Sequence, residues 1–134
     1  MTWFYEEKVL ENIPEKFIGF VYIIENLRTK RKYIGKKNFY FAKTKQIKGK
    51  KKRYKVESDW KEYYGSNDKL NEDVNLLGKH NFSREIIRFC SSKGEMTYFE
   101  AKYQFENSVL ESDDWYNSWI MCKVRKNHLT FLKK

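Results

Sequence analysis

The sequence predicts an α+β fold with a small antiparallel three-stranded sheet flanked by helices. Three observations predict it: two short apolar segments joined by a turn, a third apolar segment at residues 82–90, and two stretches with apolar residues at helical spacing. A chain of 134 residues has the length of one domain. We therefore expect residues 1–134 to form a single domain.

The first predicted element is a β-hairpin made of residues 19–24 and 32–37. The first segment is rich in β-branched and aromatic residues, and the residues between the two segments favour a turn. A tight turn midway would place Tyr22 directly opposite Tyr33 on one face of the hairpin. Gly35 would leave room for a close approach of the backbone. By spacing alone, the two tyrosines are more typical of a half-buried aromatic pair than of a functional site.

Two further segments frame the hairpin. Residues 3–13 are predicted to form a short helix that ends at Pro14, since their apolar residues fall near one helical face. Residues 42–55 contain eight lysines and arginines and no acid, with Gly49 in the middle. This composition predicts an exposed and mobile basic loop.

The second half of the chain predicts a helix, a strand and a second helix. The first helix begins at a polar cap within residues 66–68 and ends at Gly78. Residues 82–90 follow as the third strand of the sheet. The capping-box pattern from Ser92 to Glu95 then opens a helix that runs to about residue 109 or 110.

The composition indicates a polyanionic partner. The formal net charge is +10, and 18% of the residues are aromatic. Basic charge mixed with aromatic residues is typical of nucleic-acid-binding proteins. No stretch approaches the roughly eighteen apolar residues of a membrane span, and acids stand near the N-terminus, so we expect no membrane segment and a cytoplasmic location.

The two cysteines, Cys90 and Cys122, have no close cysteine neighbour in the sequence. This spacing supports neither a zinc cluster nor a disulfide framework. Both are predicted to be small core residues.

Glu100 is the most informative carboxylate. In the helix opened by the capping box it falls inside the apolar stripe, between Met96 and Tyr103. A buried carboxylate needs a cation, a hydrogen-bond network or a metal ion. The helical pattern alone leaves a salt bridge to a neighbouring lysine and a metal site as alternatives.

The segments Phe20-Val21-Tyr22 and Tyr33-Ile34-Gly35 resemble the signature of the GIY-YIG endonuclease family. The tyrosine and the second half match, while Phe-Val replaces Gly-Ile in the first half. The resemblance extends from about residue 19 to 120 and is strongest to compact phage-type proteins related to homing endonucleases. It implies a GIY-YIG-like fold and a divalent-metal-dependent endonuclease that hydrolyses phosphodiester bonds in DNA.

The resemblance also implies roles for single residues. Glu100 would be the only protein ligand of Mg²⁺ or Mn²⁺, and Asn117, in the pair Tyr116-Asn117, would match the family asparagine. The family arginine is missing, and Lys43 stands where it is expected. The alternatives to Lys43 for this basic role are Lys36, Lys37, Lys45 and Arg53. The family histidine has no convincing counterpart, because His80 is predicted to be exposed, and Tyr63 or Tyr64 could take its place.

In the implied reaction Tyr22 takes the proton of the attacking water and Tyr33 orients the water or the phosphate. A metal ion on Glu100 would steady the leaving oxygen, and Lys43 would hold the non-bridging oxygens. A free phenol has a pKa near 10. Tyr22 can therefore act as a base at pH 7 only if nearby cations lower that pKa or if its own proton moves in concert.

The basic segment is expected to bind DNA phosphates, with binding that weakens steeply with salt and carries little sequence information. The residues expected to contact DNA are Lys36, Lys37, Lys45, Lys50, Lys51, Lys52 and Arg53.

Two other functions compete with a nuclease. One is a catalytically inactive DNA-binding or protein-blocking module on the same fold, suggested by the missing arginine and histidine. The other is an RNA-binding protein of similar charge. The sequence leaves open whether the protein is a monomer or a homodimer and whether it nicks or cuts both strands. If the chain is encoded by a phage, its location would be the cytoplasm of the infected host.

Overall fold

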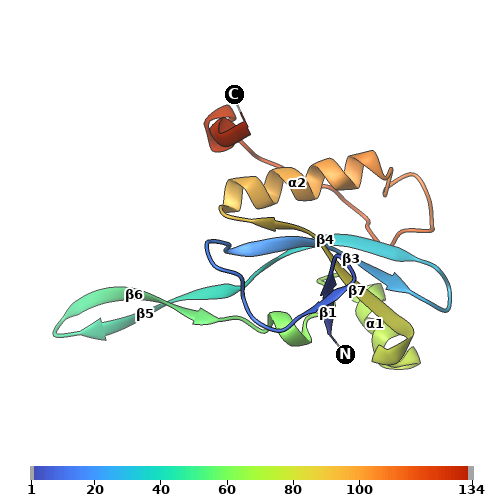
Figure 1. The fold of residues 1–134 in the computed structure, drawn as a ribbon, viewed down its shortest axis with the longest axis horizontal. Helices are drawn as coiled ribbons and strands as arrows, with labels where there is room; N and C mark the ends of the chain where they lie inside the picture. The colour runs from blue at the N-terminus through green and yellow to red at the C-terminus, as the bar shows by residue number, and fades with distance from the viewer. Residues whose placement is uncertain (1, 133–134) are drawn as a thin grey trace.

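The computed structural model describes residues 2–132 and has an α+β architecture (Figure 1). A mixed five-stranded sheet in the order β2-β1-β7-β3-β4 lies between two α-helices, and a separate two-stranded sheet is formed by β5 and β6. No helix within the described range is long and apolar enough to cross a membrane. The strands are β1 (Trp3–Tyr5), β2 (Lys8–Leu10), β3 (Gly19–Asn26), β4 (Lys32–Asn38), β5 (Tyr40–Ile47), β6 (Lys50–Glu57) and β7 (Phe82–Cys90). The helices are α1 (Asp68–Leu77) and α2 (Lys93–Glu106), with 3₁₀ turns at Trp60–Glu62, Lys79–Asn81 and Lys126–Leu132.

The prediction of a three-stranded antiparallel sheet was wrong in its extent. The three predicted strands are present as β3, β4 and β7, and they pair antiparallel. The N-terminal segment adds β1 and β2, and β1 runs parallel to β7. The sheet is therefore mixed and has five strands.

The helix predicted for residues 3–13 is instead the β1–β2 hairpin. Glu6 and Glu7 close it with φ angles of 48° and 68°, which a right-handed helix cannot accommodate. Trp3 is buried and its indole nitrogen donates a hydrogen bond to the carbonyl of Trp60 at 2.5 Å. Burial of one large aromatic residue against the sheet outweighs the weak helical spacing of this segment.

The register of β3 and β4 differs from the prediction by two residues. Tyr22 lies opposite Gly35, and Tyr33 lies opposite Ile24. The two tyrosines share one face of the sheet, as predicted, but they are diagonal neighbours with ring centroids 6.2 Å apart. Tyr22 therefore covers a glycine and not the other phenol.

The reason for the shift is a wider turn between the two strands. The side-chain oxygen of Asn26 accepts hydrogen bonds from the backbone N–H groups of Arg28 (2.9 Å) and Thr29 (3.3 Å). The turn ends at Lys30, which has a φ of 70°. An asparagine that bonds the following backbone in this way stabilises a turn. The alternation of residues along the two strands does not reveal the length of that turn, so the strand register could not be predicted from the spacing of the tyrosines.

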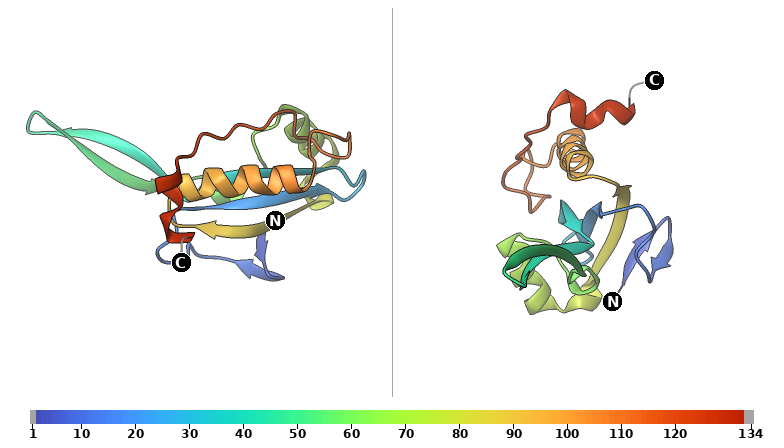
Figure 2. Two further views of the ribbon diagram at one scale, coloured as in Figure 1. Left: turned by 90° about the horizontal axis from the view of Figure 1, so that it is seen from above. Right: turned by 90° about the vertical axis from the view of Figure 1, so that its left-hand side faces the viewer.

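The sheet has an apolar core on each face. The larger one includes Tyr22 and Ile24 of β3 and is covered by Leu70 and Val74 of α1. The smaller one includes Val21 and Ile34 and is covered by α2, through Met96 and Phe99. Figures 1 and 2 show α1 and α2 on opposite sides of the sheet. Strand β4 forms the edge of the sheet, so residues packed on the two faces can approach each other there.

The basic segment at residues 42–55 is an ordered hairpin and not an irregular loop. Strands β5 and β6 pair along their whole length around a turn at Lys48 and Gly49, which have φ angles of 50° and 76°. This two-residue turn matches the twist of a hairpin. The hairpin projects away from the rest of the molecule in Figures 1 and 2.

The remaining predicted elements are largely confirmed. Helix α1 is capped by Asn67 and ends before Gly78, and β7 has the predicted bounds. Helix α2 begins after Ser92, whose hydroxyl accepts the N–H of Glu95 at 3.1 Å, but it ends at Glu106 and not near residue 109 or 110. The chain turns away there because Ser108 has a φ of 52°.

Only one cysteine prediction is confirmed. Cys90 is buried, whereas Cys122 is exposed on the segment that follows α2.

Candidate active site at the edge of strand β4

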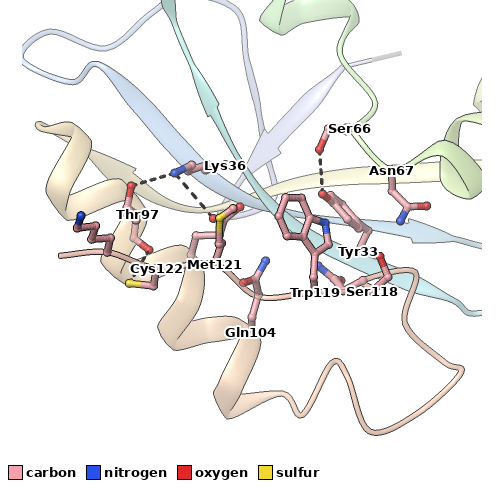
Figure 3. Close-up of a pocket in the computed structure, with 13 residues that line it drawn as sticks. Tyr33, Lys36, Ser66, Asn67, Thr97, Gln104, Ser118, Trp119, Met121 and Cys122 are labelled. Carbon is pink, nitrogen blue, oxygen red and sulfur yellow. Dashed lines mark hydrogen bonds and ion pairs between the residues drawn. The ribbon is translucent and has the colours of Figure 1, made fainter.

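A pocket with a volume of about 580 Å³ lies along the edge of β4. It is bounded by β4, the start of α1, helix α2 and the segment after residue 116, so both faces of the sheet contribute to it (Figure 3). The residues that line it are Tyr33, Lys36, Ser66, Asn67, Thr97, Glu100, Gln104, Asn117, Ser118, Trp119, Met121, Cys122 and Lys123. Three of the five predicted catalytic residues, Tyr33, Glu100 and Asn117, are among them.

Tyr33 presents its hydroxyl to this pocket. The Tyr33 hydroxyl is 3.1 Å from the hydroxyl of Ser66, and either group can be the donor (Figure 3). Burial raises the pKa of Tyr33 and the bond to Ser66 lowers it, while the nearby charge of Glu100 adds to the rise. Tyr33 therefore carries its proton at pH 7.

Tyr22 lies behind Tyr33 and is fully buried. It is not among the residues that line the pocket, and its hydroxyl has no hydrogen-bond partner among the described residues. Burial raises the pKa of Tyr22 well above the ordinary value, and the neighbouring phenols of Tyr63 and Tyr33 raise it further. Of the two conditions for a base role of Tyr22, the lowering of its pKa by nearby cations is therefore not met, because burial and the neighbouring phenols raise that pKa.

Gly35 is the reason that both tyrosines fit at this point. A side chain at position 35 would contact the hydroxyl and the Cζ atom of Tyr22, the latter at 2.7 Å, and the Cε2 atom of Tyr33 at 2.8 Å. The absence of a side chain at this position thus creates the space that the two rings fill.

Glu100 enters the pocket from α2 with 15% of its side chain exposed. Its carboxylate is 4.0 Å from the ammonium of Lys36, which also donates a hydrogen bond to the hydroxyl of Thr97 at 2.9 Å. Burial raises the pKa of Glu100, and the charge of Lys36 opposes this rise. The salt bridge that the sequence left open is thus present, but it is long and does not fully compensate the burial of the carboxylate.

Asn117 uses both polar atoms of its side chain on β4. Its Oδ1 accepts the N–H of Ile34 at 3.1 Å, and its Nδ2 donates to the carbonyl of Ile34 at 2.8 Å. Asn117 thus lines the pocket while it holds the edge strand between Tyr33 and Gly35.

Lys43 is not among the pocket residues. It lies in the middle of β5, exposed and paired with Tyr54 across the projecting hairpin. Lys36 is the basic residue that the fold brings to Glu100. Position along the chain favoured Lys43, but β4 continues into the hairpin and carries Lys43 away from the sheet.

The other predicted DNA-contacting residues divide into two groups. Lys37 is 11% exposed and pairs with Asp59 at 2.6 Å, which lowers the pKa of Asp59. The exposed group lies on the projecting hairpin and consists of Lys45, Lys50, Lys51, Lys52 and Arg53. Lys37 is thus occupied by a carboxylate, while the hairpin residues face solvent.

The candidates for the missing histidine also lie apart. His80 is exposed, as predicted. The ring of Tyr63 is 6.1 Å from that of Tyr22, with the ammonium of Lys37 4.0 Å from its centre. The ring of Tyr64 lies against the guanidinium of Arg84, 4.2 Å away. Of these residues, Tyr63 is the one next to the paired tyrosines.

Ser66 and Gln104 are among the pocket residues that were not assigned to the site from the sequence. Ser66 was given no catalytic role and was considered as a helix cap, although its hydroxyl bonds that of Tyr33. Gln104 lies one turn after Glu100 on the same face of α2, and this i, i+4 spacing could have indicated it. Its amide nitrogen donates to the carbonyl of Ile34 at 2.9 Å, while its Oε1 is buried with no hydrogen-bond partner among the described residues.

The fold and the pocket define a small α+β protein with phenol, lysine and carboxylate groups at the edge of a sheet. The family model described as "Putative endonuclease segE, GIY-YIG domain" matches residues 3–120. The chain therefore belongs to the GIY-YIG endonuclease family, and this membership implies nuclease activity with DNA as the substrate. No curated protein matches the chain, and no solved structure does.

Proposed function

We propose that the protein is a divalent-metal-dependent DNA endonuclease whose active site is the pocket at the edge of β4. The observation that carries this proposal is the meeting of Tyr33, Lys36 and Glu100 in one pocket. A phosphodiester needs an oriented water, a cation for its oxygens and stabilisation of the leaving group. These three side chains match those three needs.

The pocket residues fit a hydrated divalent cation. Among residues 2–132, no three histidine, cysteine, aspartate or glutamate side chains lie together so that they could hold a metal ion, so this part of the chain offers no complete protein cage. Glu100 is a single carboxylate whose burial favours a cation beside it, and the unpartnered Oε1 of Gln104 is a second hard oxygen in the same lining. Mg²⁺ keeps several waters and binds through one or two carboxylates. When bound at Glu100, Mg²⁺ or Mn²⁺ would supply charge stabilisation for the leaving oxygen.

Lys36 takes the basic role in this proposal, in place of Lys43. It is already fixed by Thr97 and Glu100, and 37% of its side chain is exposed to an incoming phosphate. An ammonium there neutralises charge that builds up on the non-bridging oxygens. Lys36 lacks the paired N–H donors of an arginine guanidinium, so it acts as a point charge.

Tyr33 takes the role of orienting and deprotonating the attacking water. Its raised pKa means that the phenol is protonated at rest, so the proton of water can be accepted only as the phenol gives up its own. The hydroxyl of Ser66, 3.1 Å away and exposed, accepts that proton as it releases its own to solvent water. Tyr22 then acts as a positioning residue that supports Tyr33 from the core side.

The test is cleavage of a supercoiled plasmid by the full chain with Mg²⁺ or with EDTA. We expect Mg²⁺-dependent nicking or linearisation by the wild type, and a loss of at least about a hundredfold in Glu100→Gln and Tyr33→Phe. Glu106→Gln and Tyr103→Phe are matched controls, because both residues lie on α2 outside the pocket lining. Both controls should cut at nearly the wild-type rate.

Two results would count against the proposal. Cleavage by Glu100→Gln at the wild-type rate would remove the carboxylate from the reaction. Gel retardation of the plasmid without cleavage at any Mg²⁺ or Mn²⁺ concentration would instead identify a binding module on the family fold.

A further inference from the structure

The β5–β6 hairpin has no packing role that explains its length. All eight residues of β5 are exposed, and β6 is exposed except for the half-buried Val56. An isolated two-stranded ribbon is marginally stable in water, and its open edges are a liability for aggregation. A ribbon kept in this state is expected to have a partner.

The charge of the hairpin indicates what the partner is. Residues 42–55 contain eight lysines and arginines and no acid. A two-stranded ribbon fits the major groove of B-form DNA, which is about 12 Å wide, whereas the major groove of A-form RNA is too deep and narrow for protein side chains. Shape and charge together favour duplex DNA.

The strand register divides the side chains of the hairpin between two faces. Residues directly opposite each other share a face. One face, here named the lysine face, carries Lys43, Lys45, Lys50 and Lys52 with the apolar residues Phe41, Ile47, Tyr54 and Val56. The other, here named the reading face, carries Ala42, Thr44, Gln46, Lys51, Arg53 and Lys55, with the pair Tyr40 and Glu57 at the base of the hairpin.

The reading face groups the side chains that distinguish bases. Thr44 lies opposite Arg53, and Gln46 lies opposite Lys51. Arginine forms two hydrogen bonds with guanine, glutamine forms two with adenine, and threonine contacts either base edges or the methyl group of thymine. Among the polar side chains of the lysine face, the lysines are point charges suited to phosphates.

We propose that the hairpin is a DNA-reading arm, in which Thr44, Gln46 and Arg53 contact base edges in the major groove. The lysine face points away from the bases, and its long side chains extend past the edges of the ribbon to the phosphates on either side of the groove. This inference rests on the proposed function in taking duplex DNA as the substrate. It revises the expectation that the basic segment carries little sequence information.

The base of the arm is fixed to the strand that carries the active-site residues. Only Phe39 separates β4 from β5, and it is buried with its ring 5.1 Å from that of Trp60. The N–H of Ser58 donates to the carbonyl of Phe39 at 2.7 Å, which joins the far strand of the hairpin to the same point. DNA read by the arm is thus held at a set distance from Lys36.

That distance gives an upper limit for the offset between reading and cutting. Ten residues separate Lys36 from Gln46, which at about 3.3 Å per residue is roughly 33 Å. This length corresponds to about ten base pairs of DNA at 3.4 Å each. The cut is therefore expected within about one helical turn of the sequence that the arm reads.

The test is selection from a pool of duplexes with a randomised central segment, bound by the full chain in EDTA and recovered by gel retardation. The wild type should enrich a motif that contains guanine and adenine positions. Arg53→Lys keeps the charge but loses the paired donors, so it should relax the guanine position by about tenfold to a hundredfold. Gln46→Ala should relax the adenine position to a similar extent.

Lys43→Gln on the lysine face is the matched control. It should weaken binding to all sequences alike, reduce the salt dependence by about one charge and leave the motif unchanged. Circular dichroism of each variant checks that the sheet and helices are retained.

Any of three results overturns the inference. They are that the wild type enriches no motif, that Arg53→Lys and Gln46→Ala both enrich the wild-type motif unchanged, or that duplex RNA competes for binding as well as duplex DNA. Because selection is done in EDTA, it does not depend on cleavage. An enriched motif without plasmid cleavage would refute the proposed nuclease and support the reading arm. Plasmid cleavage without an enriched motif would support the nuclease and refute the reading arm.

Discussion

Asn117 pairs with Ile34 as a neighbouring strand would. Its side-chain amide accepts the backbone N–H of Ile34 at 3.1 Å and donates to the backbone carbonyl of the same residue at 2.8 Å. This exchange of two hydrogen bonds is the pattern of an antiparallel pair, supplied here by one side chain at the open edge of the sheet. Because Ile34 lies between Tyr33 and Gly35, the amide fixes the stretch of β4 that forms the pocket.

Asn117→Ala should lower the free energy of unfolding by about 1–3 kcal/mol, since it leaves the buried N–H of Ile34 without a partner. Urea unfolding followed by circular dichroism measures this change. Asn75→Ala, at an exposed position of α1, is the control and should change the free energy by less than about 0.5 kcal/mol. Equal urea midpoints for Asn117→Ala and the wild type would show that the clamp does not stabilise the edge.

The elements that the sequence predicted well are those whose signals are local. The cap of α1, the bounds of β7 and the capping box of α2 depend on residues within a few positions of one another. Glu100 was found because helical geometry places any residue within an apolar stripe on a known face.

The features that the sequence could not predict depend on distant partners. Trp3 is drawn into a strand by contacts with Trp60, which lies 57 positions away. The placement of Lys36 beside Glu100 likewise follows from the packing of α2 on β4, which no spacing in either segment records. The resemblance to a family located the pocket, but it could not decide between Lys43 and Lys36.

Gly35→Ala should destabilise the protein by about 1–3 kcal/mol, because the new methyl group meets the rings of Tyr22 and Tyr33. The hydroxyl of Tyr22 is the nearest obstacle, so adding Tyr22→Phe should recover part of this loss. A double-mutant cycle measured by urea unfolding should therefore give a coupling between positions 22 and 35 of at least about 0.5 kcal/mol. Strict additivity would mean that the two side chains do not share this space.

The buried phenol of Tyr22 should make the fold sensitive to alkali. Its pKa is raised in the folded state, so the phenol ionises first in the unfolded chain, and the free energy of unfolding should fall as the pH rises above about 10. Tyr22→Phe should reduce this fall and leave stability at pH 7 equal or slightly higher, since the hydroxyl has no partner among the described residues. Tyr40→Phe, at the exposed start of β5, is the control and should keep the wild-type slope.

Glu100→Gln should raise the free energy of unfolding at pH 7. Burial raises the pKa of Glu100, so the folded state loses stability as the pH increases through that value and the carboxylate ionises. The difference between variant and wild type should therefore vanish below about pH 4, where the carboxyl group is protonated in both states. Urea unfolding at several pH values, all in EDTA, measures the change.

The same variant tests the metal site without reference to activity. Mg²⁺ that binds at Glu100 should raise the Tm of the wild type with the logarithm of its concentration once that concentration exceeds the dissociation constant, and Glu100→Gln should not respond. Glu106→Gln should respond as the wild type does. An equal rise in Tm for both variants would place the binding of Mg²⁺ elsewhere on the chain.

Lys36→Met should reduce the cleavage rate of bound plasmid by about a hundredfold, since it removes the cation beside Glu100 that would neutralise the phosphate oxygens. Lys43→Met removes the same charge from the projecting hairpin, so it should weaken DNA binding and leave the cleavage rate of bound DNA near the wild-type value. Single-turnover cleavage at two protein concentrations separates these effects, because it measures binding and chemistry independently. The reverse pattern, with slow chemistry in Lys43→Met and normal chemistry in Lys36→Met, would return the basic role to Lys43 and require the hairpin to fold over the pocket during the reaction.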